Sequence, residues 1–359
     1  MKNLLLHGAY SGDNFGDTLL LKLLVRELEK YDIEIYLSNV CDKTMLHFSN
    51  CDKVKRVSKL QHIINADGLI YGGGGYFSEQ PLNKVKWYFR FIRDHILIGL
   101  IFALRRKPIG FFAVEFGPIK NNIALKLVRL ILNRSKIICA RNESSFYWLK
   151  SNSKNKNIHH TADLALGIPD LIKYINSNKP KLNEGKKFFL HPSFGACHSD
   201  LNKRLVGLLN MLVSQDKRFQ IYLLIDKDFR GVGEIISSWR KALNLKDGSI
   251  IRYSAPYEFC EKISECDYLV SNKLHTLIVA SALNKKVISI AKHPKNFSFF
   301  DDFGDNSSVI EYKQESIKKL EGFFQQIIQG EFRNLKIDQQ LNKRLELNYH
   351  LLKSFIKSI

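Results

Sequence analysis

The sequence lacks the cysteine patterns of metal-binding and disulfide-linked proteins. Six cysteines occur in 359 residues, none of them in a CxxC pair, and most lie in apolar or strand-like segments. We therefore expect reduced thiols in a cytoplasmic protein and no metal site. Residues 1–17 hold one lysine and a brief apolar run before glycine and aspartate, a pattern more typical of a first strand than of a signal peptide.

Acidic residues are scarce as well. The chain has 35 Asp and Glu against 55 Lys and Arg, which gives a formal net charge of +20, so anionic partners are favoured. The sequence shows no arginine-rich low-complexity tail, zinc-finger spacing or RNA-binding aromatic signature, and its lysines are spread along the whole chain. Nucleic acid is therefore not a predicted partner.

Long apolar runs are also missing. The apolar run at residues 96–104 is far shorter than the roughly 20 residues that span a bilayer, and basic and aromatic residues flank it within residues 84–107. A helix of this composition can rest on an anionic membrane surface, here the inner face of the membrane. It can equally be an ordinary helix that covers a sheet and extends its arginines to water. Both interpretations stay open.

What the sequence does contain is a regular alternation of short apolar runs and helical patterns, which predicts parallel strands joined by crossover helices. A stretch rich in Pro, Gly, Asn, Ser and Lys interrupts it, and the alternation then restarts. We predict an α/β fold with two doubly wound, Rossmann-like domains. The predicted parts are an N-terminal domain at 1–168, a linker at 169–186, a second domain at 187–310 and C-terminal helices at 311–359.

Open parallel sheets bind ligands beyond the carboxyl ends of their strands, and the first such turn holds Gly12, Asn14, Gly16 and Asp17. The glycines permit a tight bend, and Asn14 or Asp17 can cap the next helix, whose amino end attracts anions. The glycines do not follow GxGxxG, and no Walker lysine is present. A capped turn without a ligand is the alternative.

A second candidate is the run Gly72 to Gly75 at the end of a strand. Consecutive glycines cost conformational entropy unless something approaches the backbone closely. We predict that Gly73, Gly74 and Gly75 form a ligand-facing turn whose amides bind anionic oxygens. A flexible loop is the alternative.

Two further strands end in polar residues. Arg141 directly follows a buried-looking strand and can present its planar fork to a carboxylate or phosphate, or can pair with Asp163 as a structural ion pair. In the second domain, His191 and Ser193 follow a strand on the side where ligands bind, although a capped turn explains them almost as well.

Lys273 and His275 lie between the strand at 267–272 and the helix that follows it, and Lys292 and Lys295 lie after the next strand. A lone histidine in such a place is more often a cap. Because adjacent parallel strands end at the same edge of a sheet, these cations are expected to converge, and a histidine among lysines favours an anion site.

In this order, the motifs resemble those of the polysaccharide pyruvyl transferase family. The resemblance lies in Gly16 and Asp17; Gly72 to Gly75; Arg141; Ala162 and Asp163; Lys273, Leu274 and His275; and Lys295. The chain departs from the family pattern at Lys273, where arginine is usual, and at Lys292, where an aromatic residue commonly precedes the lysine. A lysine offers a point charge in place of a bidentate fork.

The resemblance implies a GT-B-like arrangement and a transferase that moves pyruvate from phosphoenolpyruvate onto two hydroxyls of a sugar, as a ketal. It places the protein in capsule, exopolysaccharide or cell-wall glycan biosynthesis, with a sugar or lipid-linked oligosaccharide as acceptor and no cofactor. His275 would be the general acid or assist phosphate departure. Arg141, Lys273, Leu274 and Lys295 would bind the donor, while acceptor or phosphate binding would involve Gly12, Asn14, Gly16, Asp17, Gly73, Gly74, Gly75, His191 and Ser193.

Two other functions stay open. A GT-B-type glycosyltransferase that uses a nucleotide sugar would need groups that recognise the ribose and base, and the lysine-rich edge offers no obvious carboxylate for a ribose diol. A non-catalytic, membrane-associated anion-binding component of a glycan-synthesis complex would use residues 84–107 equally well.

Overall fold

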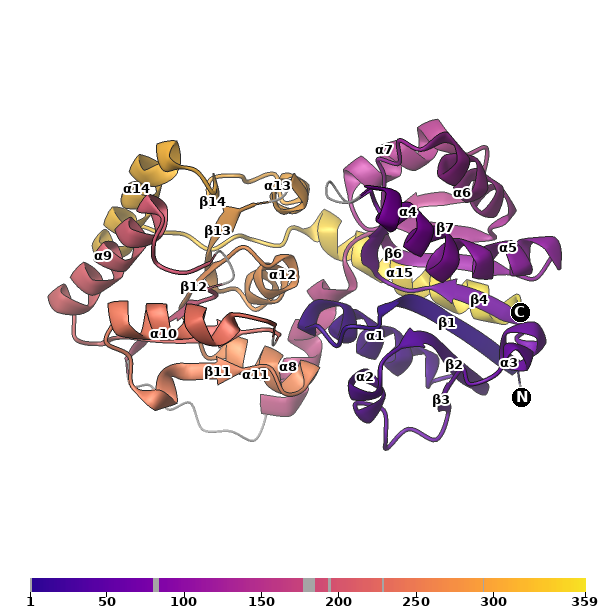
Figure 1. Ribbon diagram of the computed structural model, residues 1–359, viewed down its shortest axis with the longest axis horizontal. Coiled ribbons are helices and arrows are strands. Elements are labelled where there is room, and N and C mark those ends of the chain that lie inside the picture. The colour runs from indigo at the N-terminus through magenta and orange to yellow at the C-terminus, as the bar shows by residue number, and fades with distance from the viewer. Residues whose placement is uncertain (1, 80–83, 177–184, 193–194, 228, 293) are drawn as a thin grey trace. The chain divides into compact units, whose positions relative to one another are not determined.

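The structure is a computed structural model of the 359 residues. It describes all of them except 1, 80–83, 177–184, 193–194, 228 and 293, and it leaves out the side chains of 84–85, 173–176 and 294–295 (Figure 1). The chain divides into two compact units. Unit 1 comprises Met1–Leu164 and Gln339–Ile359, and unit 2 comprises Ala165–Asp338.

Unit 1 is built on a parallel sheet with the strand order β3-β2-β1-β4-β6-β7-β8, and β5 pairs with β6. Every residue of β4 and β7 is buried, because helices cover both faces of the sheet. The strands are β1 (Lys2–Tyr10), β2 (Ile33–Val40), β3 (Val54–Arg56), β4 (Gly68–Tyr71), β5 (Gly74–Phe77), β6 (Ile109–Phe116), β7 (Ile137–Ala140) and β8 (Ile158–His160).

Successive residues of β6 show which helices cover which face, since neighbouring side chains in a strand point to opposite sides. Phe111 belongs to a core cluster with Phe102 and Ile131 of two helices on one face. Phe112 packs against Phe355 of the C-terminal helix on the other face, with ring centroids 5.8 Å apart. The helices of this unit are α1 (Phe15–Leu28), α2 (Asp42–Leu46), α3 (Leu60–Asn65), α4 (Lys84–Phe91), the π-helix η1 (Ile92–Ile96), α5 (Leu97–Leu104), α6 (Asn122–Arg134), α7 (Glu143–Asn152) and α15 (Gln339–Lys357).

Unit 2 contains a second parallel sheet, with the order β11-β10-β9-β12-β13-β14. Its strands are β9 (Lys186–Leu190), β10 (Phe219–Ile225), β11 (Ile250–Arg252), β12 (Tyr268–Ser271), β13 (Lys286–Ala291) and β14 (Val309–Glu311). Its helices are α8 (Ile168–Asn176), α9 (Asp200–Gln215), α10 (Val232–Ala242), α11 (Pro256–Ser264), α12 (Leu274–Ala282), α13 (Pro294–Asp302) and α14 (Ile317–Gln329), with short 3-10 turns η2 (Leu164–Gly167), η3 (Asp247–Ser249) and η4 (Gln314–Ser316).

The predicted fold class is confirmed, because both units are doubly wound α/β structures with parallel sheets. The first part of the linker predicted at 169–186 is helical, because α8 occupies Ile168–Asn176. Pro169 lies in the first turn of this helix, where its missing N–H removes no helical hydrogen bond. Leu171 and Ile172 are buried, so apolar packing maintains a helix where the proline indicated a break.

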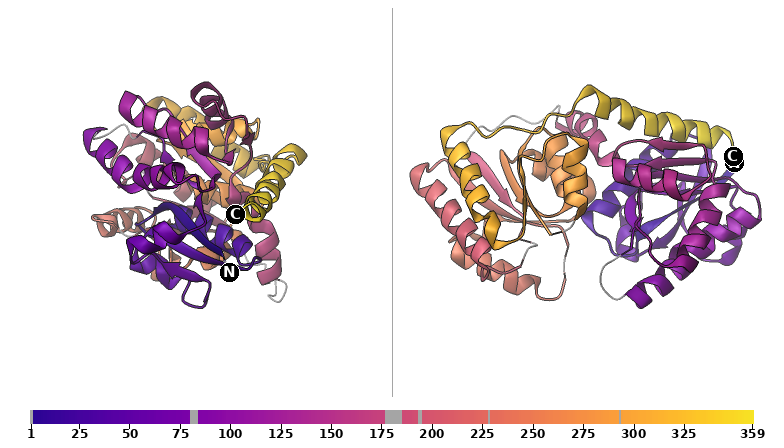
Figure 2. Two further views of the ribbon diagram at one scale, coloured as in Figure 1. Left: turned by 90° about the vertical axis from the view of Figure 1, so that its right-hand side faces the viewer. Right: turned by 90° about the horizontal axis from the view of Figure 1, so that it is seen from above.

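The C-terminal helices predicted as one tail at 311–359 divide between the units. Helix α14 packs on α9 in unit 2. Helix α15 returns to the sheet of unit 1 along β6 and β7 (Figure 2), and the side-chain amide of Asn348 donates a 2.7 Å hydrogen bond to the carbonyl oxygen of Ala162. Among the described residues, no helix combines the length and hydropathy that a bilayer span requires.

Candidate functional site

The first turn of unit 1 is capped by its own side chains. The Asn14 side-chain oxygen accepts a 3.0 Å hydrogen bond from the backbone N–H of Asp17, and its amide donates a 2.6 Å bond to the Asp17 carboxylate. A carboxylate is stabilised at the amino end of a helix, so Asp17 already occupies the place predicted for an anion. Gly16 is buried in this first helical turn, while Gly12 is partly exposed in the preceding turn.

The glycine run is required by close contacts. A Cβ atom added at Gly72 would lie 2.0 Å from the Tyr10 hydroxyl, and one added at Gly73 would lie 2.8 Å from the Leu20 side chain. Gly74 has a φ angle of +137°, a conformation that glycine alone adopts readily. The run is therefore a constrained turn and not a flexible loop.

Two carboxylates lie beside the last glycines of this turn. A Cβ at Gly74 would lie 3.3 Å from Asp17 Oδ1, and a Cβ at Gly75 would lie 3.0 Å from Glu115 Oε2. An anion on the amides of this turn would be repelled by both groups. The geometry thus favours hydroxyl groups as ligands here over the anionic oxygens that the glycine pattern led us to expect.

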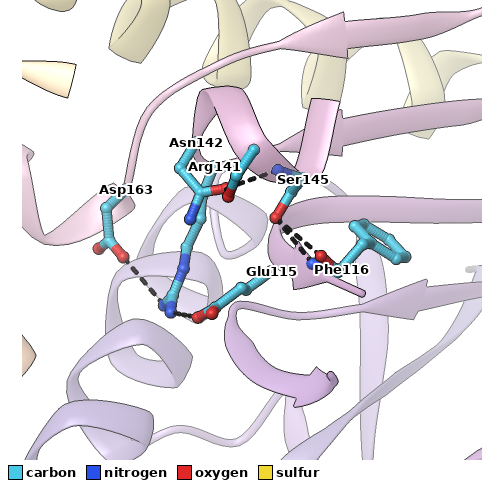
Figure 3. A network of polar contacts seen from close by, with 7 residues as sticks. Glu115, Phe116, Arg141, Asn142, Ser145 and Asp163 are labelled. Atoms are coloured by element: carbon cyan, nitrogen blue, oxygen red, sulfur yellow. Dashed lines mark hydrogen bonds and ion pairs between the residues drawn. The ribbon is translucent and has the colours of Figure 1, made fainter. Parts of the chain in front are cut away.

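Arg141 lies between Glu115 and one further carboxylate, that of Asp163, at the carboxyl edge of the same sheet (Figure 3). Its Nη1 lies 3.2 Å from Asp163 Oδ2, and its Nη2 forms an ion pair with Glu115 Oε2. The side chains of Arg141 and Asp163 are 4% and 5% exposed, and that of Glu115 is 14% exposed. Burial alone would lower the pKa of Arg141, but Glu115 and Asp163 outweigh it and raise that pKa. The charge of Arg141 is therefore more than offset within unit 1, and its pairing with Asp163 is the structural ion pair considered from the sequence.

The backbone around Glu115 is shaped by a β-bulge. Ala113 has a φ angle of +54°, and the register of β6 shifts between Phe111 and Val114 where it pairs with β7. Bulges often re-aim a side chain next to a functional site. Glu115 is the one residue of β6 that is not fully buried, so the bulged strand directs its single charged side chain toward solvent at the carboxyl edge of the sheet.

The end of β6 is also fixed to the next helix. The Asn142 side chain accepts a 2.9 Å hydrogen bond from the backbone N–H of Ser145 and thereby caps α7. The hydroxyl of Ser145 accepts a 2.8 Å bond from the backbone N–H of Phe116 (Figure 3). The residues that directly follow Glu115 and Arg141 are thus linked through Ser145, which helps to fix the backbone from which the two side chains extend.

In unit 2, the ends of three adjacent strands bring an imidazole, a carboxylate and an ammonium group together. His191 follows β9, Asp226 follows β10 and Lys273 follows β12. Asp226 Oδ1 lies 3.0 Å from His191 Nε2, and its Oδ2 lies 3.2 Å from Lys273 Nζ. Burial by itself would raise the pKa of Asp226, but His191 and Lys273 outweigh that effect and hold this pKa below its usual value.

Lys273 and His275 are only partly covered, whereas Leu274 between them is buried. The Lys273 side chain is 39% exposed, so Asp226 anchors an ammonium group that solvent can still reach. His275 lies in the first turn of α12 and is partly exposed, whereas Leu274 and His191 are buried. The edge therefore has an ammonium group and an imidazole that are both partly exposed to solvent.

Hydrogen bonds align the neighbouring strand ends with this edge. The amide of Asn296 in α13 donates to the Asn272 carbonyl oxygen at 3.0 Å and to the Ser289 hydroxyl at 3.3 Å. These bonds tie β12 and β13 to the first turn of α13, where Lys295 lies. The side chain of Lys295 and the whole of Ser193 lie outside the described part of the structure.

Sequence reasoning missed two residues of these edges, Glu115 and Asp226. Each had a recognisable signal, because Glu115 is the single charge in an apolar strand and Asp226 directly follows one. Within the described residues, no group of three His, Cys, Asp or Glu side chains could hold a metal ion. The two edges differ in charge: the edge in unit 1 has three carboxylates around one guanidinium, and the edge in unit 2 offers an accessible lysine and histidine.

Comparison with known proteins decides the family. The sequence model that describes the polysaccharide pyruvyl transferases matches residues 14–294, a range that includes Glu115, Arg141, Asp226, Lys273 and His275. The chain belongs to the polysaccharide pyruvyl transferase family. No curated protein sequence matches it.

Solved structures similar to this pyruvyl transferase family member show its fold. The UDP-GlcNAc 2-epimerase of Neisseria meningitidis, bound to UDP-GlcNAc, has a TM-score of 0.64 at 12% identity and covers 100% of both chains. The UDP-GlcNAc 2-epimerase of Methanocaldococcus jannaschii has a TM-score of 0.62 at 13% identity, over 98% of this chain and 100% of its own. These likenesses confirm the GT-B-like fold with a helical C-terminal segment, and at such identity they concern the fold alone.

Proposed function

We propose that the protein transfers pyruvate from phosphoenolpyruvate to two hydroxyls of one sugar, forming a ketal in the biosynthesis of a capsule, exopolysaccharide or cell-wall glycan. The observation that carries the proposal is the edge of unit 2, where Asp226 anchors Lys273 and leaves its ammonium group accessible beside His275. Membership of the pyruvyl transferase family supports the same reaction class.

The donor would bind at the edge of unit 2. Phosphoenolpyruvate carries a carboxylate and a phosphate, which need cations in a site where charge is weakly screened. Lys273 would bind one of these groups, together with Lys295 and backbone groups around Leu274. His275 would supply a proton to the methylene carbon or to the departing phosphate.

The reaction requires no oxidant or reductant. Protonation of the methylene carbon makes the adjacent carbon electrophilic, and one sugar hydroxyl adds to that carbon and loses its proton. The bond between this carbon and the phosphate oxygen then breaks, inorganic phosphate leaves with the electron pair, and the second hydroxyl closes the ketal. Each hydroxyl must give up a proton, so a base near the acceptor accelerates the reaction.

The acceptor would bind at the edge of unit 1, which supplies such a base. Asp17 and Glu115 would accept hydrogen bonds from sugar hydroxyls beside the turn at Gly74 and Gly75, and Glu115 would take up the proton because it is the most exposed carboxylate of the ion-pair network. Arg141 would then act as a positioning residue that orients Glu115, and not as the donor-binding group inferred from the family pattern.

We further propose a cytoplasmic location and a lipid-linked oligosaccharide as the natural acceptor. All six cysteines are free thiols, which is usual in a reducing compartment. Contact with a membrane through residues 84–107 is a separate proposal, because it depends on the outer surface of α4 and α5 and not on the site.

The proposal is tested by incubating the protein with phosphoenolpyruvate and a panel of aryl glycosides and lipid-linked sugars. We expect release of inorganic phosphate together with an acceptor product that has gained the mass of a pyruvyl ketal. A parallel arm supplies UDP-sugars in place of phosphoenolpyruvate. Turnover of a UDP-sugar without any ketal across the panel would show a glycosyltransferase instead.

A further inference from the structure

Large apolar side chains are exposed on the outer surface of two neighbouring helical segments in unit 1. Phe89, Leu104 and Ile123 are 74%, 78% and 67% exposed, and Leu97 and Leu130 are exposed as well. These five make up half of the ten large hydrophobic side chains that are exposed in the described part of the chain. Exposed apolar residues gathered in this way mark an interaction surface.

Helical spacing places these side chains on one side of each helix. Along α4, η1 and α5, exposed basic and apolar side chains follow one another at intervals of about one or two turns: Arg90, Arg93, Leu97 and Leu104. Phe102 lies on the opposite side and is buried in the core. The exposed residues therefore form one stripe that points away from the sheet.

Helix α6 adds a second stripe of the same kind. Ile123, Lys126 and Leu130 are exposed at helical spacing, whereas Val128 and Ile131 are buried. Helix α6 contacts both α5 and η1, and Figure 1 shows α4, α5 and α6 on the same side of the sheet of unit 1. We call the exposed side chains of α4, η1, α5 and α6 the outer face.

The charges on the outer face are almost all positive. Asp94 is the single acidic residue of 84–107, and residues 122–134 contain none. Asp94 is paired with Arg93 at 2.5 Å and also interacts electrostatically with Arg90, but one carboxylate is outnumbered by the cations of this face. Within the described residues, Lys86 and Lys126 have no ion-pair partner.

The π-helix fixes this face to the core. The backbone carbonyl of His95 in η1 accepts a 2.6 Å hydrogen bond from the Tyr71 hydroxyl. The imidazole ring of His95 also faces the core, where its Nδ1 lies 2.8 Å from Nε2 of buried His7. Inward contacts at His95 thus hold the helix while Arg93 and Leu97, on either side of it, remain outside. The outer face is preformed and does not need to fold upon binding.

We propose that the outer face binds the surface of an anionic phospholipid bilayer. The apolar side chains would enter the boundary between headgroups and acyl chains, and the cations would contact lipid phosphates. Exposed apolar groups alone would suit a protein partner equally well, but the excess of unpaired cations around them selects an anionic surface. This proposal does not depend on pyruvyl transfer, because no residue of the proposed site takes part in it.

Flotation with vesicles tests the proposal on the full chain. We expect the protein to float with vesicles of phosphatidylcholine and phosphatidylglycerol, to bind vesicles of phosphatidylcholine alone more weakly, and to dissociate as salt is raised. Replacing Lys86 and Arg90 with glutamine should weaken binding roughly fivefold for each cation removed. Replacing Phe89, Leu97 and Leu104 with serine should weaken it by more than about tenfold.

A matched variant carries Leu46→Ser and Leu60→Ser, which remove side chains that are 71% and 62% exposed elsewhere in unit 1. It should bind vesicles as the unchanged protein does, and circular dichroism should confirm that every variant is folded. Equal binding by the outer-face and matched variants, or no binding by the unchanged protein, would overturn the proposal. A dimer in analytical ultracentrifugation that the Phe89, Leu97 and Leu104 replacements dissociate, without vesicle binding, would identify a protein interface instead.

Discussion

At the scale of single residues, the catalytic proposal depends on groups whose partners leave them accessible on one side. Lys273 is held by Asp226 yet exposed, and Glu115 is held by Arg141 yet reaches solvent. A charge that is anchored before the substrate arrives loses little entropy upon binding, which is the physical basis of preorganisation. The proposal therefore depends on Asp226 and Arg141, which hold these groups in place, as much as on the groups that would contact the substrate.

The role of Glu115 is tested by Glu115→Gln, which keeps the size of the side chain but removes the base. We expect kcat for phosphate release to fall by roughly 10²-fold or more, with a small change in the KM for phosphoenolpyruvate. Glu27→Gln is the matched control, because Glu27 pairs with Lys30 on the surface of the same unit. A Glu115→Gln enzyme that keeps full kcat while folded would exclude this residue as the base.

His275→Ala should remove about 10² to 10⁴ of the rate if this imidazole transfers a proton in the reaction. The comparison is His198→Ala, since His198 is an exposed histidine of the same unit. Initial rates of phosphate release across pH should also lose one ionisation in the His275 variant and keep it in the control. Equal activity of the two variants would leave His275 without a catalytic role.

At the scale of elements, the strands were predictable and the details that orient functional side chains were not. A strand buried on both faces must be a continuous apolar run, so β4, β6 and β7 were evident from composition. The bulge at Ala113 left no such signal, because alanine does not mark a positive φ angle. An ion pair of Arg141 with Asp163 could be proposed from the sequence, but its ion pair with Glu115 could not. The pair with Glu115 depends on the register between β6 and β7, which the bulge shifts.

His95 of the π-helix η1 contacts buried His7 of strand β1, and this histidine pair has a consequence for stability. Desolvation by burial, the largest cause, lowers the pKa of His95 to about 4, and burial together with the neighbouring His95 lowers the pKa of His7 well below its usual value. The folded protein therefore binds fewer protons at these sites than the unfolded chain, whose histidines titrate near pH 6.5.

This difference predicts a loss of stability in mild acid. The stabilisation from a neutral His95 is complete above about pH 6.5 and declines as the pH falls toward about 4, by roughly 2 kcal/mol between pH 8 and pH 5. Urea unfolding followed by circular dichroism at both pH values measures it. His95→Gln should reduce the difference, and an unchanged pH dependence in that variant would assign the effect to other histidines.

At the scale of the whole molecule, the sequence predicted two α/β domains but not how the C-terminal residues are shared between them. The apolar faces of α14 and α15 show that each helix is buried, yet amphipathicity does not say against which sheet. Helix α15 packs on β6 and β7 of unit 1, where Phe355 contacts Phe112. Partner choice is set by shape and by contacts distant in sequence, which no local pattern contains.

Unit 1 should consequently depend on a residue very near the C-terminus. Phe355→Ala removes a fully buried ring and should cost about 3 to 5 kcal/mol. Limited proteolysis should then cleave within residues 2–164 first, while a fragment that corresponds to unit 2 persists. Phe229→Ala, which truncates an exposed ring, should cleave like the unchanged protein, and early loss of unit 2 in the Phe355 variant would contradict the assignment of α15 to unit 1.

The return of α15 to the first sheet also reverses the order in which the two units can be completed during synthesis. The ribosome makes most of unit 1 first, but β6 and β7 lack their cover on one face until residues 339–357 have emerged. Unit 2 has all of its residues by Asp338. The unit that is begun first is therefore finished last, and its sheet must avoid wrong partners through the translation of the whole second unit.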